Sequence, residues 1–389
     1  MAFSEVGLSR LEQVLQGHVA QGSAPGLVAL LAEEGQTRVF AMGSMSLEGQ
    51  SPVRLDTIFR IASMTKPITA AAAMMLVEEG KLSLEEPIER LAPELAHRHV
   101  LKRIDGPLDD TVPANRAITL EDVLTFRLGW GVVFSSTYPI VEAVAGLPGF
   151  GMPNPKLTLT PDEFMRRLGT LPLMAQPGTQ WLYTTGSNVL GVLVSRAARK
   201  PLDQVFAERI FAPLGMTDTA FEIHREKLDR FITGYAPRDG KLTLFDPPDG
   251  MYLGAPSFPA GDSGLISTAG DFCAFARFMT SGLAPDGRRL LSERSLKAMT
   301  TDHLTAAQRK DGSIILGDGM GWGYGMGVRV EDSPYGVARG AYGWPGGFGT
   351  SWFNDPAKGR TAILLTQRVF ESPDPPRVHK DFWQAVSAV

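Results

Sequence analysis

Residues 59–70 read FRIASMTKPITA and contain the pattern Ser63-Met64-Thr65-Lys66 at the start of an apolar segment. In a helix, side chains three positions apart lie on one face, so we expect the Lys66 amine to reach the Ser63 hydroxyl. A serine hydroxyl is a poor nucleophile unless a basic group takes its proton. The spacing therefore predicts a serine whose own helix supplies a base, with the free N–H groups of the helix start beside it.

The residues after Lys66 predict a buried helix. Residues 68–77 are almost all apolar or small, and Glu79-Gly80 ends the run. Burial removes water from a lysine at the start of such a helix, which favours its neutral, basic form. The four-residue pattern alone is weak, because a chain of this length holds about one such match by chance. The rest of the chain has to support it.

Composition limits the possible partners. The chain has 389 residues, of which 43% are apolar and 21% charged, which is typical of a globular protein with roughly two structural units. Its net charge of −4 provides no basic field, so we expect neither a nucleic-acid partner nor a membrane partner. Cys273 is the only cysteine, and residues 1–21 have the pattern of an amphipathic helix rather than a signal peptide, so we expect a cytoplasmic protein.

The predicted strands gather at the two ends of the chain, and the predicted helices fill its middle. We expect strands at 27–32, 38–42, 326–330, 350–354 and 361–366, and helices at 120–128, 161–168, 187–199, 202–211 and 381–389. This order predicts an α/β (α+β) fold, in which helices flank an antiparallel sheet built from both termini. The sheet subdomain would span 1–81 and 257–389, and a mostly helical subdomain 82–256. Ser63 would then lie at the seam, where ligand sites usually form.

Further stretches resemble a known superfamily. They are PGTQWLYTTG at 177–186, PLGMTDT at 213–219, AGDSGLIST at 260–268 and GTSWFNDP at 349–356. Together with the serine and lysine pattern, they resemble the serine β-lactamases and penicillin-binding proteins. The resemblance is greatest to the class C β-lactamase-like branch, and within it to the family VIII carboxylesterases. It implies a class C-like fold.

The resemblance also implies the site residues. It places Tyr183, 120 residues from Ser63, beside Ser63 and Lys66 as a third group that relays protons. It matches Trp344-Pro345-Gly346-Gly347 to the strand motif on the other wall of the site, so that the N–H groups of Ser63 and Gly347 form the oxyanion hole. It assigns Trp344, Gly346 and Phe126 to substrate binding.

Three departures from the superfamily pattern affect specificity. Thr185 stands where an asparagine is common, and Phe126 and Leu128 stand where one block usually has polar residues. Trp344 replaces a lysine that would bind the carboxylate of a β-lactam. The loss of this cation favours neutral, apolar esters. Aromatic residues expected near the cleft agree with an apolar pocket: Trp130, Phe134, Tyr138, Phe150, Tyr252, Phe258, Tyr342, Trp344 and Phe348.

These observations predict a serine carboxylesterase that hydrolyses small neutral esters through an acyl-enzyme on Ser63, with weak β-lactam hydrolysis as a possible side activity. No cofactor and no metal is implied, and the expected partner is a small-molecule ester. Three alternatives stay open: a β-lactamase or D-amino-acid peptidase, an acyltransferase, and a non-catalytic binding protein on the same scaffold. The sequence fixes neither the oligomeric state nor which of Lys66 and Tyr183 accepts the proton first.

Overall fold

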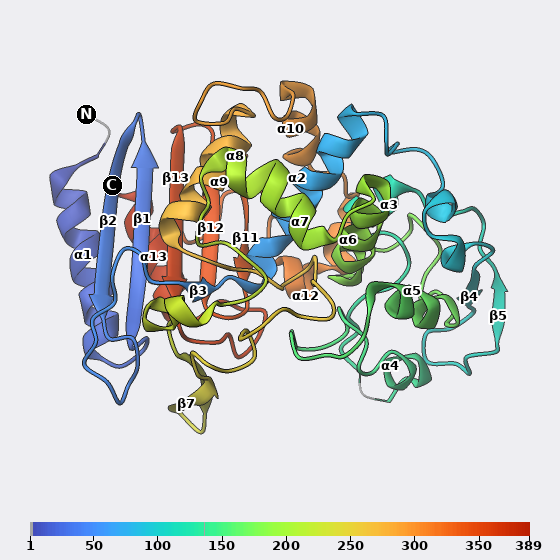
Figure 1. The fold of residues 1–389 in the computed structure, drawn as a ribbon, viewed down its shortest axis with the longest axis horizontal. Helices are drawn as coiled ribbons and strands as arrows, with labels where there is room; N and C mark the ends of the chain where they lie inside the picture. Colours follow the sequence, from blue (N-terminus) through green and yellow to red (C-terminus); the bar gives the residue numbers. More distant parts are fainter. Residues whose placement is uncertain (1–2, 136) are drawn as a thin grey trace.

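A seven-stranded antiparallel sheet combines strands from both ends of the chain (Figure 1). The computed structural model describes residues 3–135 and 137–389. The hairpin of β1 (Gly26–Glu33) and β2 (Gln36–Gly43) pairs through β1 with β13 (Arg360–Thr366). The order is β2-β1-β13-β12-β11-β10-β9, where the others are β9 (Met320–Trp322), β10 (Gly327–Arg329), β11 (Tyr342–Gly346) and β12 (Thr350–Asp355). The predicted fold class and strand clustering are confirmed, although β9 was not predicted and β11 was indicated only by the family resemblance.

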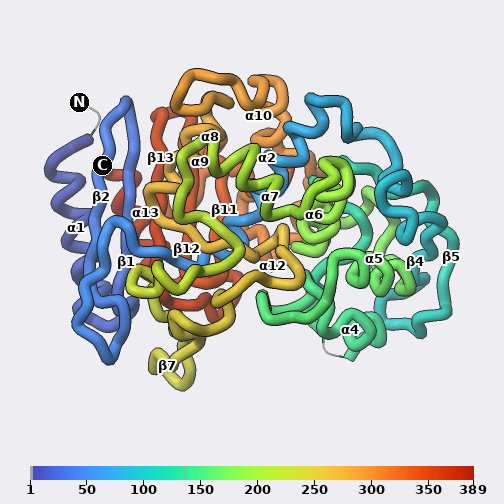
Figure 2. The backbone as a smooth tube through the Cα atoms, viewed as in Figure 1, coloured from blue at the N-terminus to red at the C-terminus, as the bar shows by residue number. Residues whose placement is uncertain are grey.

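Helices cover both faces of this sheet, which explains why β1 is apolar along nearly its whole length. On one face, Leu27, Ala29 and Leu31 pack with α1 (Glu5–Ala20) and α13 (Arg377–Ser387). Val28 and Leu30 point to the opposite face and join the main core. Alternate residues of a strand point to opposite faces, so a strand covered on both sides is apolar at every position. The N–H of Ser4, directly before α1, donates to the Val389 carbonyl at 3.3 Å, so the C-terminus lies beside the start of α1 (Figure 2).

The main core surrounds α2 (Thr65–Glu78), which packs against α6 (Thr185–Ala198). Residues 70–73 of α2 are four alanines without exposed surface, and such small side chains let neighbouring helices approach closely. The predicted helix start at Ser63 needs a small correction. Ser63 lies in a 3₁₀ turn (Ala62–Met64) that leads into α2, and Ala62 before it adopts the left-handed φ of 42°.

Between residues 82 and 256 the regular elements are mainly short helices joined by irregular segments, and those between residues 99 and 198 lie on the right in Figure 1. The predicted helix at 120–128 ends early, because Phe126 adopts φ 57° and breaks the helical path. The helices are α3 (Leu120–Leu124), α4 (Pro139–Ala143), α5 (Pro161–Gly169), α6, α7 (Leu202–Phe206), a π-helical turn (Ala207–Phe211) and α8 (Ala212–Leu214). The small hairpins are β4 (His99–Leu101) with β5 (Thr111–Pro113), and β6 (Gly234–Arg238) with β7 (Lys241–Asp246).

The remaining elements connect these parts. β3 (Phe59–Arg60) precedes Ser63 and pairs with β8 (Ile266–Ser267), which leads into α9 (Ala269–Ser281). α10 (Glu293–Met299), α11 (Ala306–Asp311) and α12 (Ser313–Leu316) follow. Among the helices in the described ranges, none has both the length and the apolar character needed to cross a membrane. The subdomain boundaries near 82 and 257 stay a prediction.

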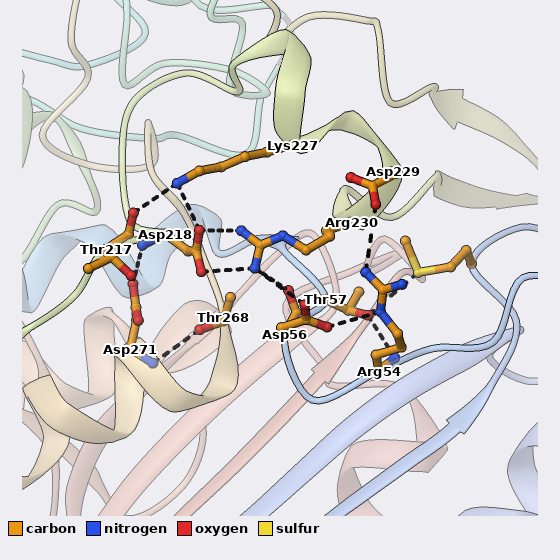
Figure 3. Close-up of polar contacts among 11 residues, drawn as sticks. Arg54, Asp56, Thr57, Thr217, Asp218, Lys227, Asp229, Arg230, Thr268 and Asp271 are labelled. Carbon is orange, nitrogen blue, oxygen red and sulfur yellow. Dashed lines mark hydrogen bonds and ion pairs between the residues drawn. The ribbon is translucent and has the colours of Figure 1, made fainter.

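A network of ion pairs fixes the segment before β3 (Figure 3). The Asp218 carboxylate accepts hydrogen bonds from the Arg230 guanidinium, and the Asp271 carboxylate accepts the N–H of Asp218 at 2.7 Å. Arg230 also approaches the Asp56 carboxylate at 3.5 Å. The Arg230 carbonyl accepts the N–H of Ile58 at 2.7 Å, directly before β3. The network therefore ties α9 and the 213–219 stretch to the segment that leads to Ser63.

We expect Asp218→Asn to lower the free energy of unfolding at pH 7 by about 1 to 3 kcal/mol, because Arg230 and Lys227 lose their shared anion. Burial alone would raise the pKa of the Asp218 carboxyl, but the hydrogen bonds from Arg230 and Lys227 outweigh it, and the pKa lies below its ordinary value. Such a carboxyl stabilises the fold above its unfolded pKa, near 3.9, and this contribution is lost as the pH falls through the lower folded value.

Urea unfolding at several pH values tests this expectation. The stability gap between the wild type and Asp218→Asn should be constant above about pH 5 and shrink below about pH 4. Asp286→Asn is the matched control, because Asp286 makes a comparable pair with Arg288 at 2.6 Å but is half exposed. If the difference in free energy of unfolding between the wild type and Asp218→Asn stays constant down to the pH of acid unfolding, the Asp218 charge does not stabilise the fold.

Candidate active site

The structure places the Lys66 amine against the Ser63 hydroxyl. Lys66 Nζ donates a hydrogen bond to Ser63 Oγ at 2.8 Å. Only 1% of Lys66 is exposed, whereas Ser63 is half-buried and lines a cavity. The three-residue spacing thus brings the two side chains together, as the sequence predicts. A buried amine in contact with an accessible hydroxyl is the arrangement that activates a serine nucleophile.

Two further groups hold the Lys66 amine. Its Nζ donates a second hydrogen bond to the backbone carbonyl of Asp262 at 2.8 Å, and it lies 4.5 Å from the centre of the Tyr183 ring. Tyr183 precedes α6 and is 120 residues from Ser63 in the chain. The fold therefore brings Ser63, Lys66 and Tyr183 to one cavity.

The Tyr183 hydroxyl has a neutral hydrogen-bond donor in Trp344. Trp344 lies on β11 and is 3% exposed, and its indole Nε1 donates to Tyr183 Oη at 2.6 Å. Sequence reasoning treated Trp344 only as a missing cation and an apolar wall. It missed this hydrogen bond because nothing in the sequence shows which way the indole ring points.

An aromatic cluster fixes the Tyr183 ring. Trp181, Trp322, Trp344 and Phe126 surround it with ring centres 5.6 to 6.2 Å away. Phe126 was predicted to bind substrate, but it is fully buried and meets the Tyr183 ring edge-on at 5.8 Å. Phe126 is not among the residues that line the cavity. The prediction is corrected because the φ of 57° that ends α3 is accompanied by burial of this ring in the core.

The two glycines after Pro345 lie in different environments. Gly347 lines the cavity, and open space lies where its Cβ would be. The N–H of Phe370 donates to the Gly347 carbonyl at 2.7 Å, and the N–H of Gly349 donates to the Gly346 carbonyl at 3.0 Å, so the peptides on both sides of Gly347 are held in place. Gly346 is instead behind the wall, since a Cβ there would be 2.2 Å from the Ile61 carbonyl oxygen. Gly346 is thus needed for close packing against the Ser63 turn, and the prediction that it contacts substrate is not supported by its position.

The cavity has a volume of about 310 Å³ and is mostly apolar. Lys66 is the only cationic residue among the described residues that line it, whereas Asp262 and Glu371 contribute carboxylates. Arg368 pairs with Glu371 at 2.8 Å. The apolar and aromatic lining residues are Ala62, Val132, Phe134, Met152, Pro153, Tyr183, Ile315, Trp344, Pro345, Phe348, Phe370 and Pro373.

The other predicted cleft residues have different positions. Of the predicted aromatic residues, Phe134, Trp344 and Phe348 line the cavity. Phe150 and Phe258 line a neighbouring cavity of about 230 Å³, which shares Met152, Pro153, Asp262 and Ser263 with the first. The remaining ones are not among the residues that line either cavity: Trp130, Tyr138, Tyr252 and Tyr342.

Thr185, where an asparagine is common, is not among the residues that line either cavity. It is fully buried, and its hydroxyl donates to the Gly149 carbonyl at 3.0 Å. This hydrogen bond holds the 146–154 loop, which lines the neighbouring cavity. Thr185 therefore provides no amide for an acylamino group of a substrate, and instead holds the loop that forms part of the neighbouring cavity wall.

Arg60 anchors the strand that leads to Ser63. Its Nε donates to Asp246 Oδ2 at 2.6 Å, and its guanidinium lies 4.0 Å from the centre of the Phe231 ring. Burial lowers the pKa of Arg60, although the Asp246 carboxylate opposes this shift. An arginine guanidinium stays protonated in proteins, so Arg60 is charged near neutral pH even with this shift. Arg60 and Asp246 thus form a buried ion pair that fixes the entry to the site.

Comparisons with known proteins agree with this geometry. The family model described as Beta-lactamase matches residues 11–382. Protein Rv1367c of Mycobacterium tuberculosis is 40% identical over 337 residues, which cover 85% of this chain and 82% of that protein. Esterase EstB of Burkholderia gladioli is 29% identical over 389 residues, which cover 93% of this chain and 91% of EstB.

A solved structure extends the similarity to the whole fold. EstCE1, described as a hydrolase with promiscuous acyltransferase activity, has a TM-score of 0.83 and 25% identity, and the match covers 98% of each chain. The family match, the sheet topology and the serine-lysine contact are mutually consistent. The chain therefore belongs to the beta-lactamase family, within the superfamily of serine β-lactamases and penicillin-binding proteins, and is a serine hydrolase.

Proposed function

We propose that the protein is a carboxylesterase of the family VIII type, which hydrolyses small neutral esters through an acyl-enzyme on Ser63. The charge of the cavity carries this proposal. Among the described lining residues the only cation is Lys66, and its amine is already bonded to Ser63 and Asp262. A substrate carboxylate would meet an apolar wall with Glu371 at its rim, so a neutral ester is favoured.

In the proposed reaction, the Ser63 oxygen attacks the ester carbonyl carbon while Lys66 and Tyr183 accept the serine proton. The N–H groups of Ser63 and Gly347 stabilise the negative oxygen of the tetrahedral intermediate. The intermediate collapses, the C–O bond to the alcohol breaks, and the proton passes to the leaving alcohol. Water then attacks the acyl-enzyme, with the same pair taking its proton, and releases the acid and free Ser63.

Trp344 supports the phenol in this reaction. Its indole N–H, 2.6 Å from the Tyr183 oxygen, stabilises negative charge on that oxygen when the phenol gives up its proton. A lysine in this place would stabilise the same charge and also attract anionic substrates. The tryptophan therefore supports the chemistry without adding a cation to the cavity.

The similar proteins support an ester substrate. EstB is named an esterase, and EstCE1 is described as a hydrolase that also transfers acyl groups. Transfer requires that an alcohol replace water at the second step, and an apolar cavity accommodates such an acceptor. We propose hydrolysis as the main reaction, because nothing in the described cavity distinguishes a particular acceptor alcohol.

A matched pair of substrates tests this proposal. We expect kcat/KM for nitrophenyl butyrate to exceed that for the nitrophenyl half-ester of succinic acid by about 10-fold to 100-fold, because the two acyl groups are equal in length but the succinyl group is charged. Added salt should narrow the difference, since it screens the carboxylates of the site. A cephalosporin should react less efficiently than the butyrate. Equal or greater efficiency on the anionic substrates would instead favour a β-lactamase or peptidase.

A further inference from the structure

Asp262 is a buried acid in the wall of the catalytic cavity, and its carboxylate has no cationic partner in the described part of the chain. It is 5% exposed and lines the cavity. One carboxylate oxygen accepts the Ser263 hydroxyl at 2.6 Å, and the other accepts the Thr184 hydroxyl at 3.2 Å. A carboxylate buried with hydroxyl partners alone costs stability. Its position beside the reacting groups suggests what it contributes.

The backbone of Asp262 holds the lysine. Its carbonyl accepts the Lys66 amine at 2.8 Å, and its N–H donates to the Asn188 side-chain oxygen at 3.2 Å. Asn188 lies on α6 and is 1% exposed. The residue whose carbonyl receives Lys66 is therefore held on its N-terminal side by α6, the helix that follows Tyr183.

The side chain of Asp262 reaches the residue next to Tyr183. Thr184 has φ 148° and ψ −21°, a conformation that a residue with a side chain rarely adopts. Such a conformation persists only where surrounding contacts fix it. The hydrogen bond from the Thr184 hydroxyl to Asp262 is one of these contacts, and it ties the peptide after Tyr183 to the segment that binds Lys66.

We propose that Asp262 is a positioning residue that fixes Lys66 and Tyr183 relative to each other, the first through its carbonyl and the second through Thr184. This inference rests on the proposed function, since it assigns a role to a residue that does not itself exchange the proton. This role could not be predicted from the sequence, because Asp262 is one residue within the AGDSGLIST stretch and its partner Thr184 is 78 positions away.

Removal of the carboxylate should impair the chemical step more than substrate binding. We expect Asp262→Ala to lower kcat on nitrophenyl butyrate about 10-fold to 100-fold with KM changed less than about 3-fold, because a misplacement of about 1 Å has this effect. Asp262→Asn should retain kcat within about 5-fold, since the amide offers an acceptor and a donor to the two hydroxyls. A loss in Asp262→Asn as large as in Asp262→Ala would overturn positioning by hydrogen bonds.

A double-mutant cycle separates this role from general stability. Thr184→Val removes the hydroxyl partner, so its effect on kcat should overlap with that of Asp262→Ala, and the double variant should be little worse than either single variant. Thr185→Val is the matched control, because it removes a buried hydroxyl that bonds to Gly149 instead. Its effect should add to that of Asp262→Ala. If the Thr184 and Asp262 effects also add, the proposed link is wrong.

Two readouts keep the proposals distinct. A fluorophosphonate that labels Ser63 in the wild type tests the proposed function itself. A labelled wild type together with unchanged kcat in both Asp262→Ala and Thr184→Val would overturn only the positioning role. If Asp262→Ala does not fold, Thr184→Val decides alone, since it leaves the carboxylate and its Ser263 partner in place.

Discussion

Ser63→Ala is expected to abolish hydrolysis of nitrophenyl butyrate, with kcat at least about 10⁴-fold below the wild type. The variant lacks the oxygen that would form the acyl-enzyme, and water would have to attack the ester without covalent catalysis. The lost hydrogen bond to Lys66 is on the cavity side, so the fold should tolerate the change. Esterase rate and fluorophosphonate labelling, followed by mapping of the labelled peptide, measure the effect.

Two other serines line the same cavity and provide the critical comparison. They are Ser263, whose hydroxyl donates to Asp262, and Ser372 at the rim. Among the described side chains, only that of Ser63 is hydrogen-bonded to the Lys66 amine. Labelling that persists in Ser63→Ala and maps to Ser263 or Ser372 would show that we have assigned the wrong nucleophile. A wild type that neither labels nor turns over ester would favour the non-catalytic binding protein.

A matched variant checks that loss of any buried serine does not inactivate the protein. Ser187 on α6 is fully buried, and its hydroxyl lacks a hydrogen-bond partner within the described ranges. Removal of an unpaired hydroxyl costs little stability. Ser187→Ala should therefore fold and retain activity, and only the Ser63 variant should lose it.

The fold could be predicted where local pattern and tertiary contacts agree. The β1 and β2 hairpin, α1 and α2 have apolar patterns that fit their packing against the core, so the sequence predicted their existence and type, with ends that differ from the structure by one to four residues. The predicted C-terminal end of α3 at residue 128 was wrong, because the helix ends at Leu124. Residues 120–128 favour a helix locally, but burial of Phe126 in the aromatic cluster requires a left-handed turn at that residue. Such tertiary effects are not visible in local propensity.

The site, like the fold, could be predicted only where a contact follows from local spacing in the sequence. The Lys66 contact with Ser63 follows from helical spacing, and the position of Tyr183 followed from a family resemblance rather than from physics. The Trp344 hydrogen bond to Tyr183 and the Thr184 hydrogen bond to Asp262 join segments 161 and 78 residues apart. Neither segment carries a local sign of its partner. The polar contacts that orient the reacting groups therefore had to come from the structure.

Replacement of Lys66 should be nearly as damaging as replacement of Ser63. We expect Lys66→Ala to lower kcat about 10³-fold, because it removes the amine that is hydrogen-bonded to the Ser63 hydroxyl. General base catalysis typically contributes about 10²-fold to 10⁴-fold to the rate. The variant also leaves the Asp262 carbonyl without its donor, so its melting temperature should be measured beside its kinetics.

A small amine separates the chemical role of Lys66 from its packing. The truncated side chain leaves space beside the Ser63 oxygen, so propylamine should raise the rate of Lys66→Ala in proportion to the concentration of free base, and should have no effect on Ser63→Ala. Lys66→Arg makes the opposite test, because a guanidinium keeps the positive charge but does not give up its proton at ordinary pH. If Lys66→Arg were nearly as active as the wild type, a fixed charge at this position would suffice, and Tyr183 rather than Lys66 would have to accept the serine proton.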